Sequence, residues 1–95
     1  MKLRWLRSGS VSLRRQVRFI EAENPAAATR VRRAIRKSVL RLIDFPESGL
    51  IGQLPGTREI VVAGLPFVVV YRITSDTVEI LRVFHTSQER SDPFH

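Results

Sequence analysis

The sequence predicts an α+β fold: an N-terminal strand, then an antiparallel helical hairpin packed on a small antiparallel sheet, in the order β-α-α-β-β-β. Two observations lead to this prediction. The first half of the chain carries apolar residues at helical spacing, and the second half carries three short runs rich in β-branched residues. A chain of 95 residues has room for one modest core, so we expect a single domain over residues 1–95.

The first strand is predicted at residues 2–6, KLRWL. The segment SGS, residues 8–10, predicts the start of a helix, because a serine oxygen can accept a backbone N–H at an N-cap. Leu13, Val17 and Ile20 follow at i, i+4 and i+7, which places them on one helical face.

The second helix is predicted from Pro25 to about Asp44, with Asn24 as its N-cap and Pro46 beyond its end. Its apolar residues fall within one narrow arc: Ala28, Val31, Ile35, Val39 and Leu42. Its cations fall on the opposite arc: Arg30, Arg33, Lys37 and Arg41. The helix is therefore expected to bury an apolar stripe and to expose a cationic ridge.

Residues 47–57, ESGLIGQLPGT, predict a loop with a type II turn at Pro55 and Gly56. Strands are predicted at REIVV (58–62), FVVVYRI (67–73) and TVEILRVFH (77–85). The connections AGLP and TSD are too short for a crossover, so these strands are antiparallel neighbours. The middle strand is almost continuously apolar, which predicts that both of its faces are covered.

The last strand carries the candidate site residues Arg82 and His85. Strict alternation would place Val78, Ile80, Arg82 and Phe84 on one face, and Glu79, Leu81, Val83 and His85 on the other. Arg82 has two interpretations: an ion pair with Glu59 or Glu79, or a place on a binding face. His85 is either a hydrogen-bonded structural histidine or a base.

The charge is strongly uneven. Residues 1–41 hold twelve Lys/Arg and two Glu, whereas residues 42–95 hold four Arg and seven Asp/Glu, for a net charge of +7. A basic half predicts an anionic partner. No run has the length of a signal peptide core or a membrane span, and no cysteine is present, so we expect a cytoplasmic protein without membrane contact. Two histidines and no cysteine predict no metal site and no cofactor.

Several segments together resemble the RelE/ParE toxin superfamily of bacterial type II toxin–antitoxin systems, and more closely its ParE branch. They are ENPAAA, FPESG, PGTREIVV, PFVVVYRI and DTVEILRVFH, in that order, over residues 2 to about 88. The resemblance implies the fold predicted above. It also implies a growth-inhibiting toxin that is neutralised by a ParD-like or other small antitoxin in a hetero-oligomer, with operator DNA reached only through the antitoxin.

Two activities belong to this superfamily: RelE-like members cleave mRNA in the ribosome, and ParE-like members poison DNA gyrase. RelE-like toxins share several basic residues, and this sequence has other residues at the matching positions. Glu59 and Val61 stand in place of lysines, Val68 in place of an arginine, and Gln88 in place of a basic residue. Since RNA cleavage needs a base, an acid and cations, these replacements disfavour the nuclease.

The predicted function is thus a non-enzymatic, ParE-type toxin that binds and poisons gyrase. The alternatives are a ribosome-dependent mRNA endonuclease of RelE type and a basic nucleic-acid-binding module without toxicity. No catalytic residues are assigned. The candidate target-binding surface comprises Arg58, Arg82, His85 and Gln88. The candidate contact with an antitoxin or polyanion is the cationic ridge, unless that ridge is simply a solvated face.

Overall fold

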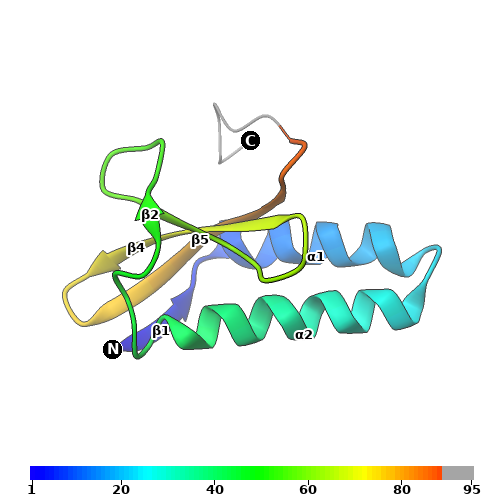
Figure 1. Cartoon of the computed structure of the whole chain (residues 1–95), viewed down its shortest axis with the longest axis horizontal. Coiled ribbons are helices and arrows are strands. Elements are labelled where there is room, and N and C mark those ends of the chain that lie inside the picture. Colours follow the sequence, from blue (N-terminus) through cyan, green and yellow to red (C-terminus); the bar gives the residue numbers. More distant parts are fainter. Residues whose placement is uncertain (89–95) are drawn as a thin grey trace.

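The computed structural model describes residues 1–88, in which two helices pack on one face of a five-stranded sheet of order β1-β5-β4-β3-β2 (Figure 1). The predicted α+β architecture, with its helical hairpin, is confirmed. The elements are β1 (Lys2–Trp5), α1 (Arg7–Glu21), α2 (Pro25–Arg41), β2 (Leu50–Ile51), β3 (Arg58–Val61), β4 (Phe67–Thr74) and β5 (Thr77–His85).

The sheet is mixed, so the prediction of a purely antiparallel sheet is wrong for β1. This strand runs parallel to β5, from the pair Lys2 and Thr77 to the pair Trp5 and Ile80. The strands β3, β4 and β5 are antiparallel because tight turns join them. No such turn constrains β1, because the helical hairpin follows it in the chain, before the other strands, and acts as a crossover connection.

The segment predicted as a loop contains an additional strand, β2. Leu50 pairs with Glu59 and Ile51 pairs with Arg58 at the end of the sheet. The chain then turns back through a loop closed by the Gly52 N–H, which donates to the Thr57 carbonyl over 2.8 Å. The Gly and Pro content of residues 47–57 predicted this turn correctly, but it concealed the two residues that pair.

The helix ends differ from the predictions in two ways. The prediction of a serine N-cap for α1 is wrong: Leu6 is the N-cap, and its apolar side chain accepts no hydrogen bond from the helix terminus. The N-cap of α2 is confirmed, with Asn24 Oδ1 accepting the Ala27 N–H over 3.0 Å. This helix ends at Arg41 and not at Asp44, because the backbone tightens into i to i+3 turns over residues 42–44.

The main core lies between the hairpin and the sheet. The predicted apolar stripe of α2 is confirmed, since all five of its residues are buried. They face side chains of β4 and β5 that are also buried: Phe67, Val69, Tyr71, Val78, Ile80 and Val83. A second, smaller cluster occupies the opposite face of the sheet: Val68, Val70, Leu81 and Phe84, with Leu6 packed beside it. Strand β4 is therefore covered on both faces, as predicted.

Candidate functional site

A β-bulge in β5 decides where Arg82 lies. Val70 of β4 pairs with Arg82, but the next residue, Tyr71, pairs with Ile80, so Leu81 is an additional residue in β5. The predicted alternation is therefore wrong beyond Ile80. Leu81 and Phe84 belong to the cluster on the face away from the helices. Arg82 lies on that face too, because it is directly opposite Val70.

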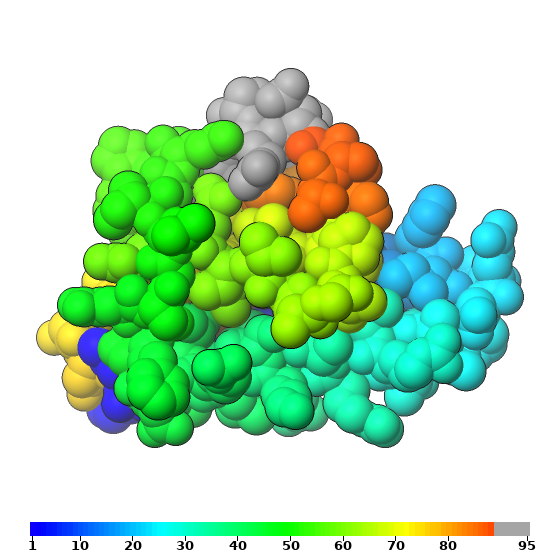
Figure 2. Space-filling view, viewed as in Figure 1, coloured from blue at the N-terminus to red at the C-terminus, as the bar shows by residue number. Residues whose placement is uncertain are grey.

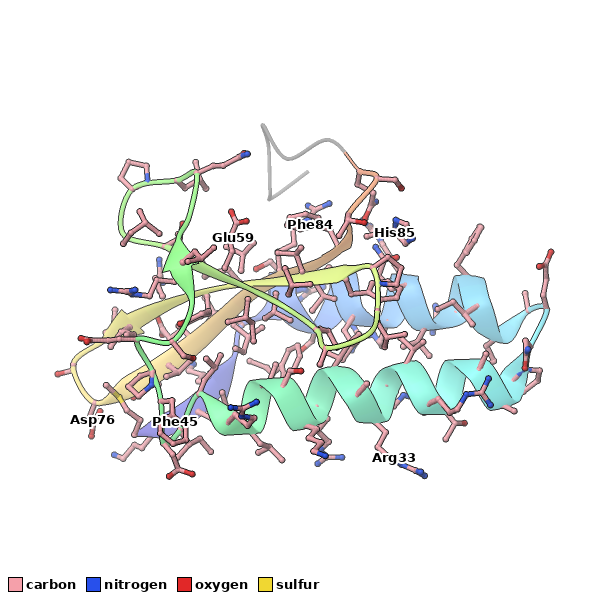
Figure 3. All side chains as sticks on the ribbon, viewed as in Figure 1. Arg33, Phe45, Glu59, Asp76, Phe84 and His85 are labelled. Atoms are coloured by element: carbon pink, nitrogen blue, oxygen red, sulfur yellow. The ribbon has the colours of Figure 1, made fainter. Side chains whose placement is uncertain are left out.

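This outer face of the sheet has an apolar floor with charged groups around it. Glu59, Val70 and Arg82 form one row across β3, β4 and β5. Figure 3 shows Glu59 and Phe84 on the side of the sheet away from the helices. The four residues of the floor, Val68, Val70, Leu81 and Phe84, are each at most 3 % exposed.

Glu79 is the carboxylate at the other end of the outer face, and it is already bound. Arg72 Nε donates to Glu79 Oε1 over 2.7 Å, and Arg4 Nη1 lies 3.9 Å from Oε2. The hydrogen bond from Arg72 holds the pKa of Glu79 below its usual value of 4.5. Of the two partners considered for Arg82, Glu79 is thus held by Arg72 and Arg4.

Three polar residues of α1 follow the edge of β5 where β1 stops. Ser8 Oγ donates to the Leu81 carbonyl over 2.6 Å, and the Val83 N–H donates to Ser12 Oγ over 2.8 Å. Gln16 Nε2 donates to Gln88 Oε1 over 2.8 Å, and that oxygen also accepts the His85 N–H. Their spacing of four residues places them on one side of the helix. They supply hydrogen bonds along an edge that would otherwise be open.

Gly9 permits this close approach. A β-carbon built at Gly9 would lie 2.5 Å from the Ile80 carbonyl oxygen, which is closer than van der Waals contact allows. The helix and the strand therefore meet backbone to backbone at this point.

His85 lies at the end of β5, beside the hairpin core and not on the outer face. Its ring meets Phe67 edge-on, with centroids 5.4 Å apart. Nδ1 accepts the Ser87 N–H over 3.1 Å and lies 2.7 Å from Ser87 Oγ. The structural interpretation of His85, as a hydrogen-bonded residue, matches these contacts.

Arg58 holds the loop that precedes β2. Its Nη1 donates to the carbonyls of Gly49 and Glu47, over 2.8 and 3.3 Å. Tyr71 supports the same loop from the core, donating to the Pro46 carbonyl over 2.6 Å and accepting the Gly49 N–H over 2.9 Å. Burial raises the pKa of Tyr71 above its usual value of 10.0. Tyr71 is fully buried in the central strand.

The four residues predicted as one target surface thus occupy three places. Arg82 lies on the outer face of the sheet, Arg58 holds the β2 loop, and His85 and Gln88 share a turn at the end of β5. Among residues 1–88, no group of three or more His, Cys, Asp or Glu is arranged to hold a metal ion.

The cationic ridge of α2 lines a broad surface hollow. Three of its four predicted members, Arg33, Lys37 and Arg41, line a hollow of about 400 Å³ together with Arg36, Leu40 and Asp44. A second hollow, of about 280 Å³, lies between the helices and is lined by Trp5, Ser10, Leu13, Arg14, Arg32 and Arg36. Sequence reasoning missed Arg14, Arg32 and Arg36, because it considered only the narrow arc opposite the core.

The chain is similar to known toxins in sequence and in fold. A family model described as "ParE toxin of type II toxin-antitoxin system, parDE" matches residues 3–90. The protein named "Putative toxin Y4kP" of Sinorhizobium fredii (strain NBRC 101917 / NGR234) is 44% identical over 71 residues, which cover 75% of this chain and 73% of that protein.

Two solved structures share the fold. The structure titled "Chromosomal ParDE TA system from P. aeruginosa" superposes with a TM-score of 0.80 at 23% identity, covering 90% of this chain and 95% of that one. The isolated E. coli RelE toxin superposes with a TM-score of 0.63 at 17% identity, covering 96% of this chain and 87% of that one. In the residues described, no helix is both long and apolar enough to cross a bilayer. The predicted RelE/ParE-like fold is confirmed.

Proposed function

We propose that this chain, which belongs to the ParE toxin family of type II toxin–antitoxin systems, acts in the cytoplasm as a single toxin domain that binds DNA gyrase and traps its cleaved-DNA state. Its family makes it the toxin component of such a system. The target is the proposed part. A gyrase poison of this kind needs a complementary binding surface and no acid–base groups of its own.

The observation that supports this target is the chemistry of the outer face. A nuclease site must bring a base, an acid and cations to a phosphate. In the described part of the chain, the floor of this face is closed hydrocarbon, with Val68 only 2% exposed. The carboxylate of Glu59 lies in the same row as Arg82, so this row carries no excess positive charge for a phosphate. Cleavage of ribosome-bound mRNA is therefore the less supported activity.

The proposed partners are a small antitoxin, in a hetero-oligomer, and gyrase. Operator DNA would be reached through the antitoxin. The proposed target surface comprises Arg82 on the outer face, Arg58 at the β2 loop, and His85 and Gln88 at the end of β5. No metal or cofactor enters the proposal, because binding alone would stop the target.

Expression without antitoxin tests the target directly. We expect growth arrest, induction of the DNA-damage response and gyrase-dependent double-strand breaks, while ribosome-bound mRNA stays intact in a reconstituted translation system. A gyrase variant that no longer binds the toxin should restore growth. Codon-dependent cuts in the ribosomal A site, with intact chromosomes, would replace gyrase by the ribosome as the target.

Arg82→Ala separates the two interpretations of Arg82. If Arg82 belongs to the target surface, we expect a variant that folds, binds antitoxin and loses toxicity. If Arg82 acts only inside the fold, its loss should lower the melting temperature and weaken antitoxin binding together. Thermal melts, antitoxin titration and a growth assay on the same variant distinguish these results. A folded, antitoxin-binding variant with full toxicity would remove Arg82 from the proposed surface.

A further inference from the structure

The two helices carry far more positive charge than their own contacts use. α2 holds six cations and no carboxylate: Arg30, Arg32, Arg33, Arg36, Lys37 and Arg41. α1 adds four arginines and a single glutamate. None of the ion pairs seen among residues 1–88 involves an α2 cation, since they join Lys2 to Asp76 and both Arg4 and Arg72 to Glu79.

The cations of α2 do not stabilise the helix that carries them. Arg33, Lys37 and Arg41 follow one another at i, i+4 and i+8, so like charges are neighbours on the helix surface. Such pairs lower helix stability slightly, and all three side chains are exposed. Figure 3 shows Arg33 directed away from the sheet. The cations are therefore arranged for contact with something outside the chain.

The hollows make one continuous cationic strip. Arg36 lines both of them, so the strip passes from Arg14 of α1, over Arg32 and Arg36, to Lys37 and Arg41 of α2. Figure 2 shows the surface of α2 along one whole edge of the molecule. Successive cations in the Arg33 row are separated by about 6 Å along the helix axis, since each residue rises about 1.5 Å. A strip of this kind fits a regular polyanion.

The physics of exposed ion pairs favours a nucleic acid over an acidic protein. An exposed pair between arginine and a carboxylate contributes only about 0–1 kcal/mol. Protein partners on such a surface need apolar anchors. Among the large exposed apolar side chains of residues 1–88, Leu40 alone lines one of the two hollows, whereas the more exposed Phe19, Phe45 and Ile51 line neither. Duplex DNA differs, because each neutralised phosphate releases condensed counterions, so exposed cations suffice.

The strip fits the backbone of a duplex better than bases. Single strands are held by aromatic side chains on which bases stack, but Trp5, the one aromatic residue that lines either of the two hollows, is half-buried. The sequence of α2 contains no Asn or Gln that could pair with adenine in a groove. Contacts with phosphates alone position a protein without selecting a sequence.

We propose that the strip formed by Arg14, Arg32, Arg33, Arg36, Lys37 and Arg41 binds the phosphate backbone of duplex DNA without sequence preference. The free toxin has this property by itself, so the proposal does not depend on gyrase being the target. A toxin that fails to bind DNA could still poison gyrase, and a toxin that binds DNA could act elsewhere.

Fluorescence anisotropy with a labelled duplex of about 30 base pairs of arbitrary sequence tests the strip. With about five phosphate contacts, a fourfold rise in salt should weaken binding by about 500-fold. The variant Arg33→Gln/Lys37→Gln should lower the salt slope by about 2 and weaken binding by about 50-fold near 0.1 M salt. The charge-matched control, Lys2→Gln/Arg15→Gln, removes two exposed cations that line neither hollow and should bind nearly as the unchanged protein does.

Three results would overturn the proposal. Equal losses in the variant and in its control would mean that net charge alone attracts DNA. Tighter binding of a single strand of the same length would exclude a backbone site for the duplex. Polyglutamate that binds the strip more tightly than the duplex does, at the same salt, would assign the strip to an acidic protein. Circular dichroism melts of both variants establish that each is folded.

Discussion

The sheet and the helical hairpin differ in how their charged residues are paired. On the sheet, Glu79 is bonded to Arg72 and lies beside Arg4, and Lys2 is paired with Asp76. On the hairpin, the cations of α2 have no carboxylate of their own helix to pair with. The residues of α2 that face the core are nevertheless buried, so the hairpin packs on the sheet through its apolar stripe.

The difference separates charges that belong to the fold from charges that belong to a partner. Where a charged or polar group is buried, it must be paired or its desolvation destabilises the protein. Where it is exposed, its loss changes stability little, and its position is free to serve binding. This difference can be tested by replacing polar residues and measuring stability. The replacement that should lower the free energy of unfolding most comes first.

Ser12→Ala should have the largest effect on stability. The change removes the oxygen that accepts the buried Val83 N–H, and it also removes a bond to the Gly9 carbonyl. A buried donor left without a partner costs about 1–3 kcal/mol, so we expect a loss of about 2 kcal/mol in urea unfolding. Ser38→Ala on α2 is the control and should change stability little. Equal effects at both positions would mean that α1 does not close the edge of β5.

The sequence predicted most elements because each has a local pattern. Apolar residues at helical spacing identified both helices, and short turns fixed the antiparallel order of β3, β4 and β5. The parallel pairing of β1 was not predicted, because its partner lies at the other end of the chain. The pairing of Leu50 and Ile51 was missed because two residues give no periodicity.

The bulge at Leu81 had a signal in the sequence that strict alternation ignored. In that alternation Arg82 falls in phase with Val78 and Ile80, both fully buried, so a guanidinium would have pointed into the core. One additional residue moves Arg82 to the outer face and returns Val83 to the core. A charge in phase with a buried face therefore indicates a bulge.

The cationic strip was predicted only in part, for a similar reason. Arg30, Arg33, Lys37 and Arg41 stand out on a helical wheel because they are opposite the apolar stripe. Arg36 and Arg32 lie at its flank, and only the packing of α1 beside α2 shows that they join Arg14 around one hollow. The sequence of one helix does not show which of its sides packs against a neighbouring helix, because tertiary packing decides this.

Glu79→Gln should have a smaller effect on stability, and this effect should appear in the acid part of the pH profile. The pKa of Glu79 is lower in the folded protein than its ordinary value of 4.5, so its pairing stabilises the fold above that pH. The contribution is lost as pH falls below 4.5 and through the lower, folded pKa. Thermal melts across this range should show a weaker acid loss in Glu79→Gln than in the unchanged protein. Parallel acid profiles would mean that the Arg72 pair does not stabilise the sheet.

Arg33→Gln/Lys37→Gln should have the smallest effect on stability, and its sign should be opposite. The two cations are one helical turn apart, and neighbouring like charges destabilise a helix by about 0.2–0.5 kcal/mol. Removing them should therefore leave stability unchanged or raise it by up to about 0.5 kcal/mol at low salt, a gain that added salt should abolish. The control Lys2→Gln/Arg15→Gln should gain nothing, since Lys2 loses its exposed pair with Asp76. A loss above about 1 kcal/mol in the α2 variant would place these cations with the charges that hold the fold, and the contrast between hairpin and sheet would fail.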